Sequence, residues 1–203
     1  MSRKQVRDDL ERFHDYSIYL PSRTIYMGSE EHHIEHGDSG TDGAMAERTA
    51  KNLHILDSIS AEPINVVMNN IGGDEYECFA IIDAIRQCRS KVIITVMGHA
   101  MSAGSLILQA ADERVMAPLA VQMMHYGTWG CIDHSKTFQK WAREGKRIDE
   151  WMEQFYLDRI HLKHPAFTLK KLKSMLDHDT FLTAEESVAL GLCDRVLESR
   201  VKE

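Results

Sequence analysis

The sequence is poor in cysteine and proline, with four of each among 203 residues. The cysteines are far apart and form no Cys-x-x-Cys pair, which favours reduced thiols over a disulfide framework; they are Cys78, Cys88, Cys131 and Cys193. No apolar run approaches the roughly 20 residues of a membrane-spanning helix. The N-terminus has a basic start but lacks the apolar stretch of a secretory signal. We therefore expect a cytoplasmic location and no membrane partner.

An excess of positive charge is also missing. The formal net charge is -7, which argues against the electrostatic footprint of a nucleic-acid-binding protein and predicts no nucleic-acid partner. There are no internal repeats, and 43% hydrophobic with 27% charged residues is ordinary for a globular protein. The length suits one domain over residues 1–203 with a core of its own.

The strongest compositional bias lies in residues 28–43, which are rich in glycine and polar residues and show no periodicity. This pattern predicts an exposed loop. The loop combines histidines with carboxylates, so a metal site is conceivable, but the spacing matches no zinc motif and a solvated acidic loop is favoured. We assign it no metal; the residues are His32, His33, His36, Glu31, Glu35 and Asp38.

Hydrophobic periodicity predicts an α/β fold with a largely parallel sheet flanked by helices. Apolar, β-branched runs alternate with segments in which apolar residues recur at helical spacing. The expected strands are 23–27, 64–69, 92–97, 114–118, 121–125 and 194–197. The expected helices are an N-terminal one ending at Pro21, then 45–56, one carrying Phe79, Ile82 and Ile85, 102–111, 135–161, 169–175 and 183–190. Residues 1–20 form an N-terminal segment.

The helix expected from Ser135 to His161 is unusually long. At 1.5 Å per residue it spans roughly 40 Å, which is too long to lie within a compact domain of this size. Its apolar stripe includes Phe138, Trp141 and Trp151. We expect it to project and to pack on another subunit, the alternative being an ordinary surface helix.

The stretch from Val92 to Ala111 joins a buried strand to a buried helix through the small-residue turn Gly98–Gly104. Ser102 then lies at the helix N-terminus, where free amides and the helix dipole favour negative charge. The turn resembles Gly-x-Ser-x-Gly, with Ala100 in place of the first glycine. An N-cap serine without chemistry is equally consistent with this stretch alone.

A serine hydroxyl becomes a useful nucleophile when a base takes its proton and an acid orients that base. His125 ends a predicted strand, and Asp179 precedes the capping-box sequence Thr183-Ala-Glu-Glu186. With 11 histidines and 31 acids in the chain, position alone does not select these residues.

Four motifs in register select them. They are Asn70-Ile-Gly-Gly73, Gly98-x-Ala-x-Ser-x-Gly104, Val121-x-Met-Met-His125, and Asp179-x-Phe-Leu-Thr-Ala-Glu-Glu-x-x-x-x-Gly-Leu-x-Asp194. From about Arg23 to Leu197, the chain resembles the ClpP family, the proteolytic subunits of the Clp protease. Tyr126-Gly127 stands where that family usually has Gln-Pro, which we expect to alter the substrate-binding strand.

The resemblance implies a crotonase/ClpP-like α/β fold and a self-compartmentalised serine endopeptidase. It implies Ser102 as nucleophile, His125 as general base and Asp179 as its orienting partner, with the amides of Gly73 and Ala103 as the oxyanion hole. It also implies two stacked rings of seven subunits that interdigitate through a handle region, residues 133–176. The substrates would be unfolded polypeptides. No cofactor is expected in this chain, because ATP would be used only by a partner unfoldase of the AAA+ type.

Two alternatives come from other functional classes. A crotonase-type acyl-CoA enzyme would share the fold and the paired-amide oxyanion hole, but it would not need Ser102, His125 and Asp179 together. A catalytically silent ring subunit would shape a mixed complex, yet such subunits generally lack a triad residue, and none is missing here. A divergent bacterial paralogue and a phage-encoded prohead maturation protease are both variants of the leading hypothesis.

Overall fold

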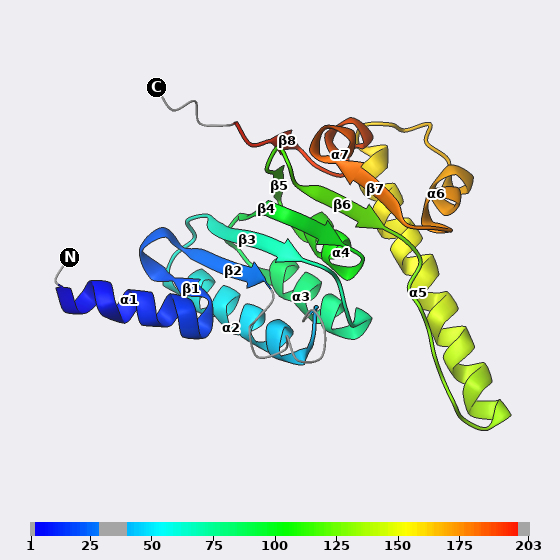
Figure 1. Cartoon of the computed structure of the whole chain (residues 1–203), viewed down its shortest axis with the longest axis horizontal. Coiled ribbons are helices and arrows are strands. Elements are labelled where there is room, and N and C mark those ends of the chain that lie inside the picture. The colour runs from blue at the N-terminus through cyan, green and yellow to red at the C-terminus, as the bar shows by residue number, and fades with distance from the viewer. Residues whose placement is uncertain (1–2, 29–39, 199–203) are drawn as a thin grey trace.

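The computed structural model describes residues 3–28 and 40–198 (Figure 1). The strands are β1 Ile18–Tyr19, β2 Thr24–Gly28, β3 Ile64–Asn70, β4 Val92–Met101, β5 Glu113–Met116, β6 Val121–Met124, β7 Thr180–Thr183 and β8 Arg195–Val196. The helices are α1 Arg3–Tyr16, α2 Gly43–Ile59, α3 Glu75–Gln87, α4 Ala103–Ala110, α5 Ser135–His161, α6 Leu169–Leu176 and α7 Ala184–Leu190, with a 3-10 turn at Leu20–Ser22.

The strands form one mixed sheet in which parallel pairs dominate. The main path runs β1-β2-β3-β4-β5-β8, and among the strands of the described residues the β1–β2 and β6–β7 pairs alone are antiparallel. Helices α2, α3 and α4 pack side by side on one face of this sheet (Figure 1). The prediction of a largely parallel α/β fold flanked by helices is confirmed.

Strand β4 pairs with two different strands along one of its edges. Its first half, Ile93–Val96, pairs with β5, and its second half, His99–Met101, pairs with β6. Gly98 lies between the halves with φ +113°, a backbone conformation that favours glycine. The switch of partner delivers the end of β4 directly beside the end of β6, where Ser102 and His125 follow.

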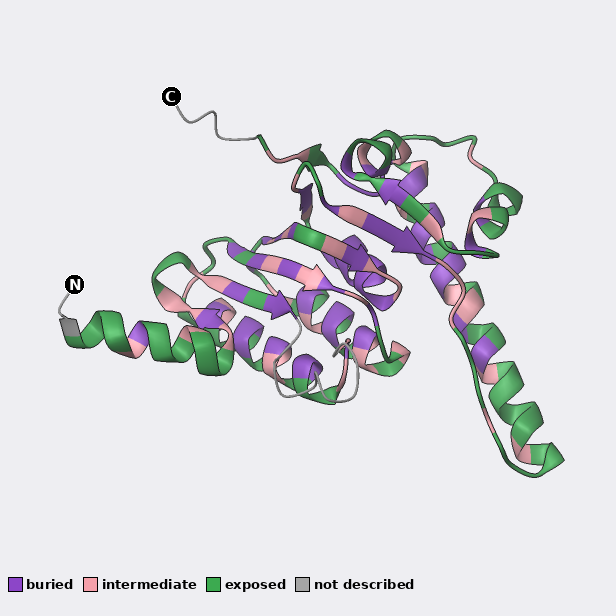
Figure 2. Ribbon diagram, viewed as in Figure 1, coloured by how far each residue is buried: buried purple, intermediate pink, exposed green. Residues whose placement is uncertain are grey.

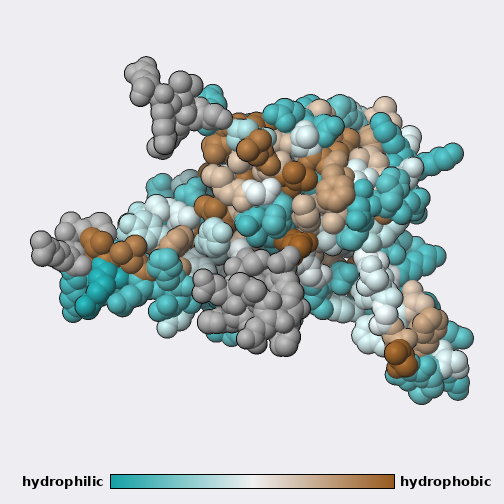
Figure 3. All heavy atoms as spheres, in the orientation of Figure 1, coloured by the Kyte–Doolittle hydropathy of each residue, from teal (hydrophilic) through white to brown (hydrophobic). Residues whose placement is uncertain are grey.

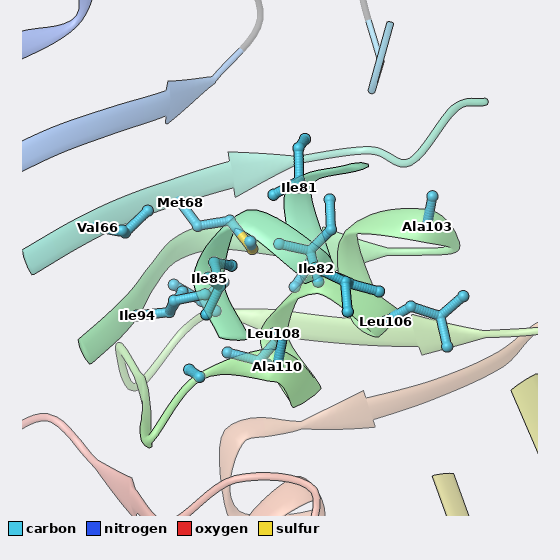
Figure 4. Packing of buried hydrophobic residues seen from close by; sticks show 14 of the residues in the cluster. Val66, Met68, Ile81, Ile82, Ile85, Ile94, Ala103, Leu106, Leu108 and Ala110 are labelled. Carbon is cyan, nitrogen blue, oxygen red and sulfur yellow. The ribbon is translucent and has the colours of Figure 1, made fainter. Parts of the chain in front are cut away.

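The core lies between the sheet and this helical layer (Figures 2 and 4). One buried hydrophobic cluster includes Val66 and Met68 of β3, Ile94 of β4, and Ile81 and Ile82 of α3. Every residue of α4 is buried, as expected from its apolar sequence. The helix that carries the strand-to-helix turn is thus enclosed by protein on all sides.

Helix α5 has two parts with different surroundings. Its C-terminal half joins the core through Met152, Phe155 and Ile160, whereas its N-terminal half is largely exposed and projects from the body (Figure 2). The segment that follows β6 runs beside the projecting half (Figure 1). The handle bounds 133–176 and the single domain over 1–203 stay predictions.

Two sequence-based boundaries were wrong, and one strand was not predicted. The N-terminal helix ends at Tyr16, because Ser17 takes φ +57° and Leu20 belongs to the 3-10 turn. Strand β4 continues to Met101 rather than ending near Met97, because Gly98 bends the strand without breaking it. Strand β7 was not among the expected strands, since four residues with one buried side chain give little periodic signal.

The histidines and acids at 31–38, and with them the question of a metal there, lie outside the described residues. In the part of the chain that the structure describes, no helix combines the length and the apolar character needed to cross a membrane.

An ion pair between a buried arginine and a partly exposed aspartate connects the segment before β8 to the body. Arg114, with a 7% exposed side chain, donates to Asp194 at 2.6 Å, and its other amino group donates to Gln109 and to the Gly191 carbonyl. Burial alone would raise the pKa of Asp194, but the hydrogen bonds from Arg114 outweigh it and hold that pKa below its usual value.

We expect Asp194→Asn to lower the free energy of unfolding by roughly 2 kcal/mol, because it leaves the buried Arg114 charge without its partner. The difference from wild type should shrink as pH falls through the lowered pKa of Asp194, where the wild-type carboxylate is itself protonated. Urea denaturation measures both effects. Lys51→Gln, which breaks the exposed Lys51–Glu47 pair, is the control and should change little; equal losses in the two variants would contradict this account.

Candidate active site

Ser102 occupies a strained turn between β4 and α4. Its φ and ψ are 50° and -123°, outside the regions that side-chain-bearing residues favour. Such strain typically costs about 1–3 kcal/mol and persists where the surrounding structure enforces it. Here the enforcement is steric and local: a Cβ added at Gly72 would lie 2.6 Å from Ser102 Cβ, and one at Gly104 would lie 2.9 Å from the Asn70 carbonyl oxygen.

Ser102 stands at the N-cap position of α4, but its side chain makes no capping hydrogen bond. Its Oγ instead lies 2.9 Å from His125 Nε2, and its backbone N–H donates to the Met123 carbonyl at 2.9 Å. The N-cap interpretation without chemistry therefore loses its physical basis, because the hydroxyl is directed to an imidazole rather than to the helix amides.

The antiparallel register of β6 and β7 brings Asp179 to His125. Met124 is paired with Thr180, so the next positions outward are His125 and Asp179. His125 Nδ1 lies 2.9 Å from Asp179 Oδ1, with side chains 25% and 58% exposed respectively. The three side chains proposed from sequence thus form one continuous chain of contacts, and its carboxylate end is open to solvent.

The loop after β3 lies against the serine turn. The Asn70 side chain accepts from the Gly72 N–H at 2.7 Å and hydrogen-bonds to Thr41 Oγ1, while the Thr41 backbone pairs with Gly72 and Asp74. Among the described residues, the N–H groups of Gly73 and Ala103 have no acceptor. Two free amides next to a serine hydroxyl can stabilise an oxyanion; their role as the oxyanion hole stays a prediction.

A buried polar network connects α4 to β6 and α5. Gln122 of β6 donates to Ser105 Oγ at 2.8 Å, and the Tyr156 hydroxyl of α5 donates to the same oxygen at 2.9 Å. All three residues are buried. Since unmade hydrogen bonds at buried sites are costly, this network fixes the position of α4 relative to β6 and therefore of Ser102 relative to His125.

Tyr126 makes two hydrogen bonds that its sequence context did not predict. Its N–H donates to the Leu176 carbonyl at 2.9 Å, and its hydroxyl donates to Glu153 at 2.6 Å. Glu153 is buried and also pairs with Lys173 at 3.1 Å. Burial, followed by the Glu153 hydrogen bond, raises the pKa of the Tyr126 phenol. Hydrogen bonds therefore hold both the backbone and the side chain of Tyr126. The sequence feature that pointed to this residue is the presence of Tyr126-Gly127 where the family usually has Gln-Pro.

A narrow cleft is lined by Ser102, Ala103 and His125. Its other lining residues are Glu75, Phe79, Leu106, Gly127, Trp129, Ile148, Asp149 and Met152. Neither Glu75 nor Asp149 was predicted from the sequence as a site residue. In the described ranges, no group of three metal-binding side chains converges here or elsewhere.

Comparison with known proteins agrees with this architecture. The family model "Clp protease" matches residues 22–200. The chain is 35% identical over 162 residues to the ATP-dependent Clp protease proteolytic subunit 2 of Pseudomonas aeruginosa, covering 79% of this chain and 78% of that protein. It is 30% identical over 192 residues to the ATP-dependent Clp protease proteolytic subunit of Deinococcus radiodurans, covering 93% and 87%. The sequence resemblance is thereby confirmed, and the chain belongs to the Clp protease family.

Proposed function

We propose that this chain is a serine endopeptidase that hydrolyses peptide bonds of unfolded polypeptides. The observation that carries the proposal is the uninterrupted array of Ser102 Oγ, His125 and Asp179, with two successive contacts of 2.9 Å. Membership of the Clp protease family supports the same reaction class.

In the proposed reaction, Ser102 Oγ attacks the scissile carbonyl while His125 Nε2 takes its proton. The oxygen that becomes negative lies against the free amides of Gly73 and Ala103, each worth on the order of 3 kcal/mol of transition-state stabilisation. The C–N bond breaks as His125 returns the proton to the leaving amine. Water, activated by His125, then hydrolyses the acyl-enzyme and restores Ser102. Asp179 holds the imidazole tautomer and stabilises its charged form.

The assembly is part of the proposal. Exposed apolar side chains gather near the end of the projecting half of α5 (Figure 3), among them Phe138, 53% exposed, and Trp141, 46% exposed. Large apolar groups of this kind mark protein contacts. We infer that they pack between two stacked rings of seven subunits, that the rings enclose the active sites, and that an ATP-using AAA+ unfoldase supplies substrates.

The alternatives are less well supported. A crotonase-type acyl-CoA enzyme does not require the Ser102–His125–Asp179 array, and a silent subunit would have no need to keep it. A prohead maturation role would concern the substrate and would leave the chemistry unchanged.

We expect Ser102→Ala to abolish hydrolysis of small fluorogenic peptides and Asp179→Asn to lower kcat about 10⁴-fold, because asparagine imposes the wrong histidine tautomer. Asp177→Asn, two residues away and also exposed, is the matched control and should retain activity. Initial rates on the purified proteins measure the effect. Wild-type turnover in Ser102→Ala would refute the serine mechanism.

Replacing Trp141 with glutamate should prevent ring stacking, because the contact between handles would bury an unpaired charge. Light scattering should then report about half the wild-type mass. Lys140→Gln, on the neighbouring exposed position, should leave the mass unchanged. A wild-type mass for Trp141→Glu would show that the rings are held by other surfaces.

A further inference from the structure

The cleft beside the proposed nucleophile has apolar walls and acidic groups. Phe79, Leu106, Ile148 and Met152 provide apolar surface, and Ile148 and Met152 are buried. Ser102 and Ala103 line the same cleft, so the cleft adjoins the proposed nucleophile and one amide of the proposed oxyanion hole.

Two carboxylates from different elements line this cleft. Glu75 begins α3, directly after the Gly72-Gly73 loop, and Asp149 lies on α5. Both residues are partly buried. Gly127 leaves room for one of them, since a Cβ at that position would lie 2.6 Å from Glu75 Oε1. The glycine two positions after His125 thus allows a carboxylate to approach the catalytic array.

Neither carboxylate has a cationic partner among the described residues. The basic side chains of this region are paired with other acids: Arg147 with Glu144 at 2.6 Å, Lys146 with Glu150 at 3.7 Å and Lys173 with Glu153 at 3.1 Å. His125 is directed to Asp179 instead.

Burial and then neighbouring charges disfavour ionisation of the Glu75 and Asp149 carboxyl groups. Burial, followed by the charge of Asp74, raises the pKa of Glu75 despite the nearby His125. Burial, followed by the charges of Glu153, Glu75 and Glu150, raises the pKa of Asp149 despite Lys173. A cation placed between the two carboxylates would relieve their repulsion and replace part of the lost solvation.

We propose that this cleft binds a positively charged side chain, lysine or arginine, of the substrate residue whose carbonyl Ser102 attacks. Glu75 and Asp149 attract the charged head, and the apolar walls contact its methylene stem. The inference rests on the proposed serine-peptidase function, which it deepens by assigning a substrate class.

The test compares peptidyl coumarin amides that differ only in the residue before the coumarin. Lysine is compared with norleucine, which has the same stem without the charge. We expect kcat/KM for lysine to exceed that for norleucine about tenfold or more, and arginine to behave like lysine. In Glu75→Gln and Asp149→Asn the lysine-to-norleucine ratio should fall several-fold, and in the double variant it should approach one. Asp158→Asn, which removes an exposed acid of the same helix that does not line the cleft, is the control and should keep the wild-type ratio.

The ratio should also rise with pH as the two carboxylates ionise through their raised pKa values. Effects of pH on the catalytic steps that the two substrates share cancel in the ratio. Norleucine cleaved as well as lysine, in a Ser102-dependent reaction, would overturn the inference and leave the proposed function intact. A pH-independent lysine preference, or one retained in the double variant, would assign the selectivity to other residues and also overturn it. If no substrate is cleaved and Ser102 is unreactive, the proposed function fails and the inference with it.

Discussion

The strained turn at Ser102 is the constraint on which the rest of the site depends. A serine at φ 50° directs its hydroxyl away from the helix it precedes, so that Oγ meets His125 Nε2. The packed surroundings of Ser102 hold its backbone in this conformation. Gly72 and Gly104 let neighbouring backbone approach, and the Ser102 N–H is bonded to β6. Local backbone strain at Ser102 thus accompanies a fixed position of its hydroxyl group.

The positions of His125 and Asp179 relative to Ser102 follow from strand pairing. Strand β4 leaves β5 for β6 at Gly98, and β6 pairs with β7 in a register that extends from Met124–Thr180 to His125–Asp179. The Ser105–Gln122–Tyr156 network then fixes the helix behind the serine. The site is therefore built on regular elements rather than on long loops, which is the arrangement that holds side chains within fractions of an ångström. The acidic cleft differs, since among the described residues its two partly buried carboxylates, Glu75 and Asp149, form no ion pair.

Much of this was predictable from sequence. The buried strand and helix around Ser102, the 27-residue α5 and the Thr183 capping box all carry strong local signals. Motifs in register also selected Ser102, His125 and Asp179, which the structure brings together. Local sequence patterns could not predict contacts between residues that are far apart in the sequence. The approach of Asp149 to Glu75 joins α5 to α3, and the Tyr126–Glu153–Lys173 contacts depend on how α5 and α6 pack. The β7 strand escaped notice because its four residues draw their stability from β6 rather than from their own sequence.

The central claim is that this geometry activates Ser102. The most direct measurement is covalent modification by a fluorophosphonate, mapped by mass spectrometry of the digested protein and compared between wild type and His125→Ala. The account predicts one adduct, on Ser102, formed rapidly in wild type and at a rate lower by orders of magnitude in a folded His125→Ala protein. Equal labelling rates in the two proteins, or an adduct on another serine such as Ser105, would contradict it.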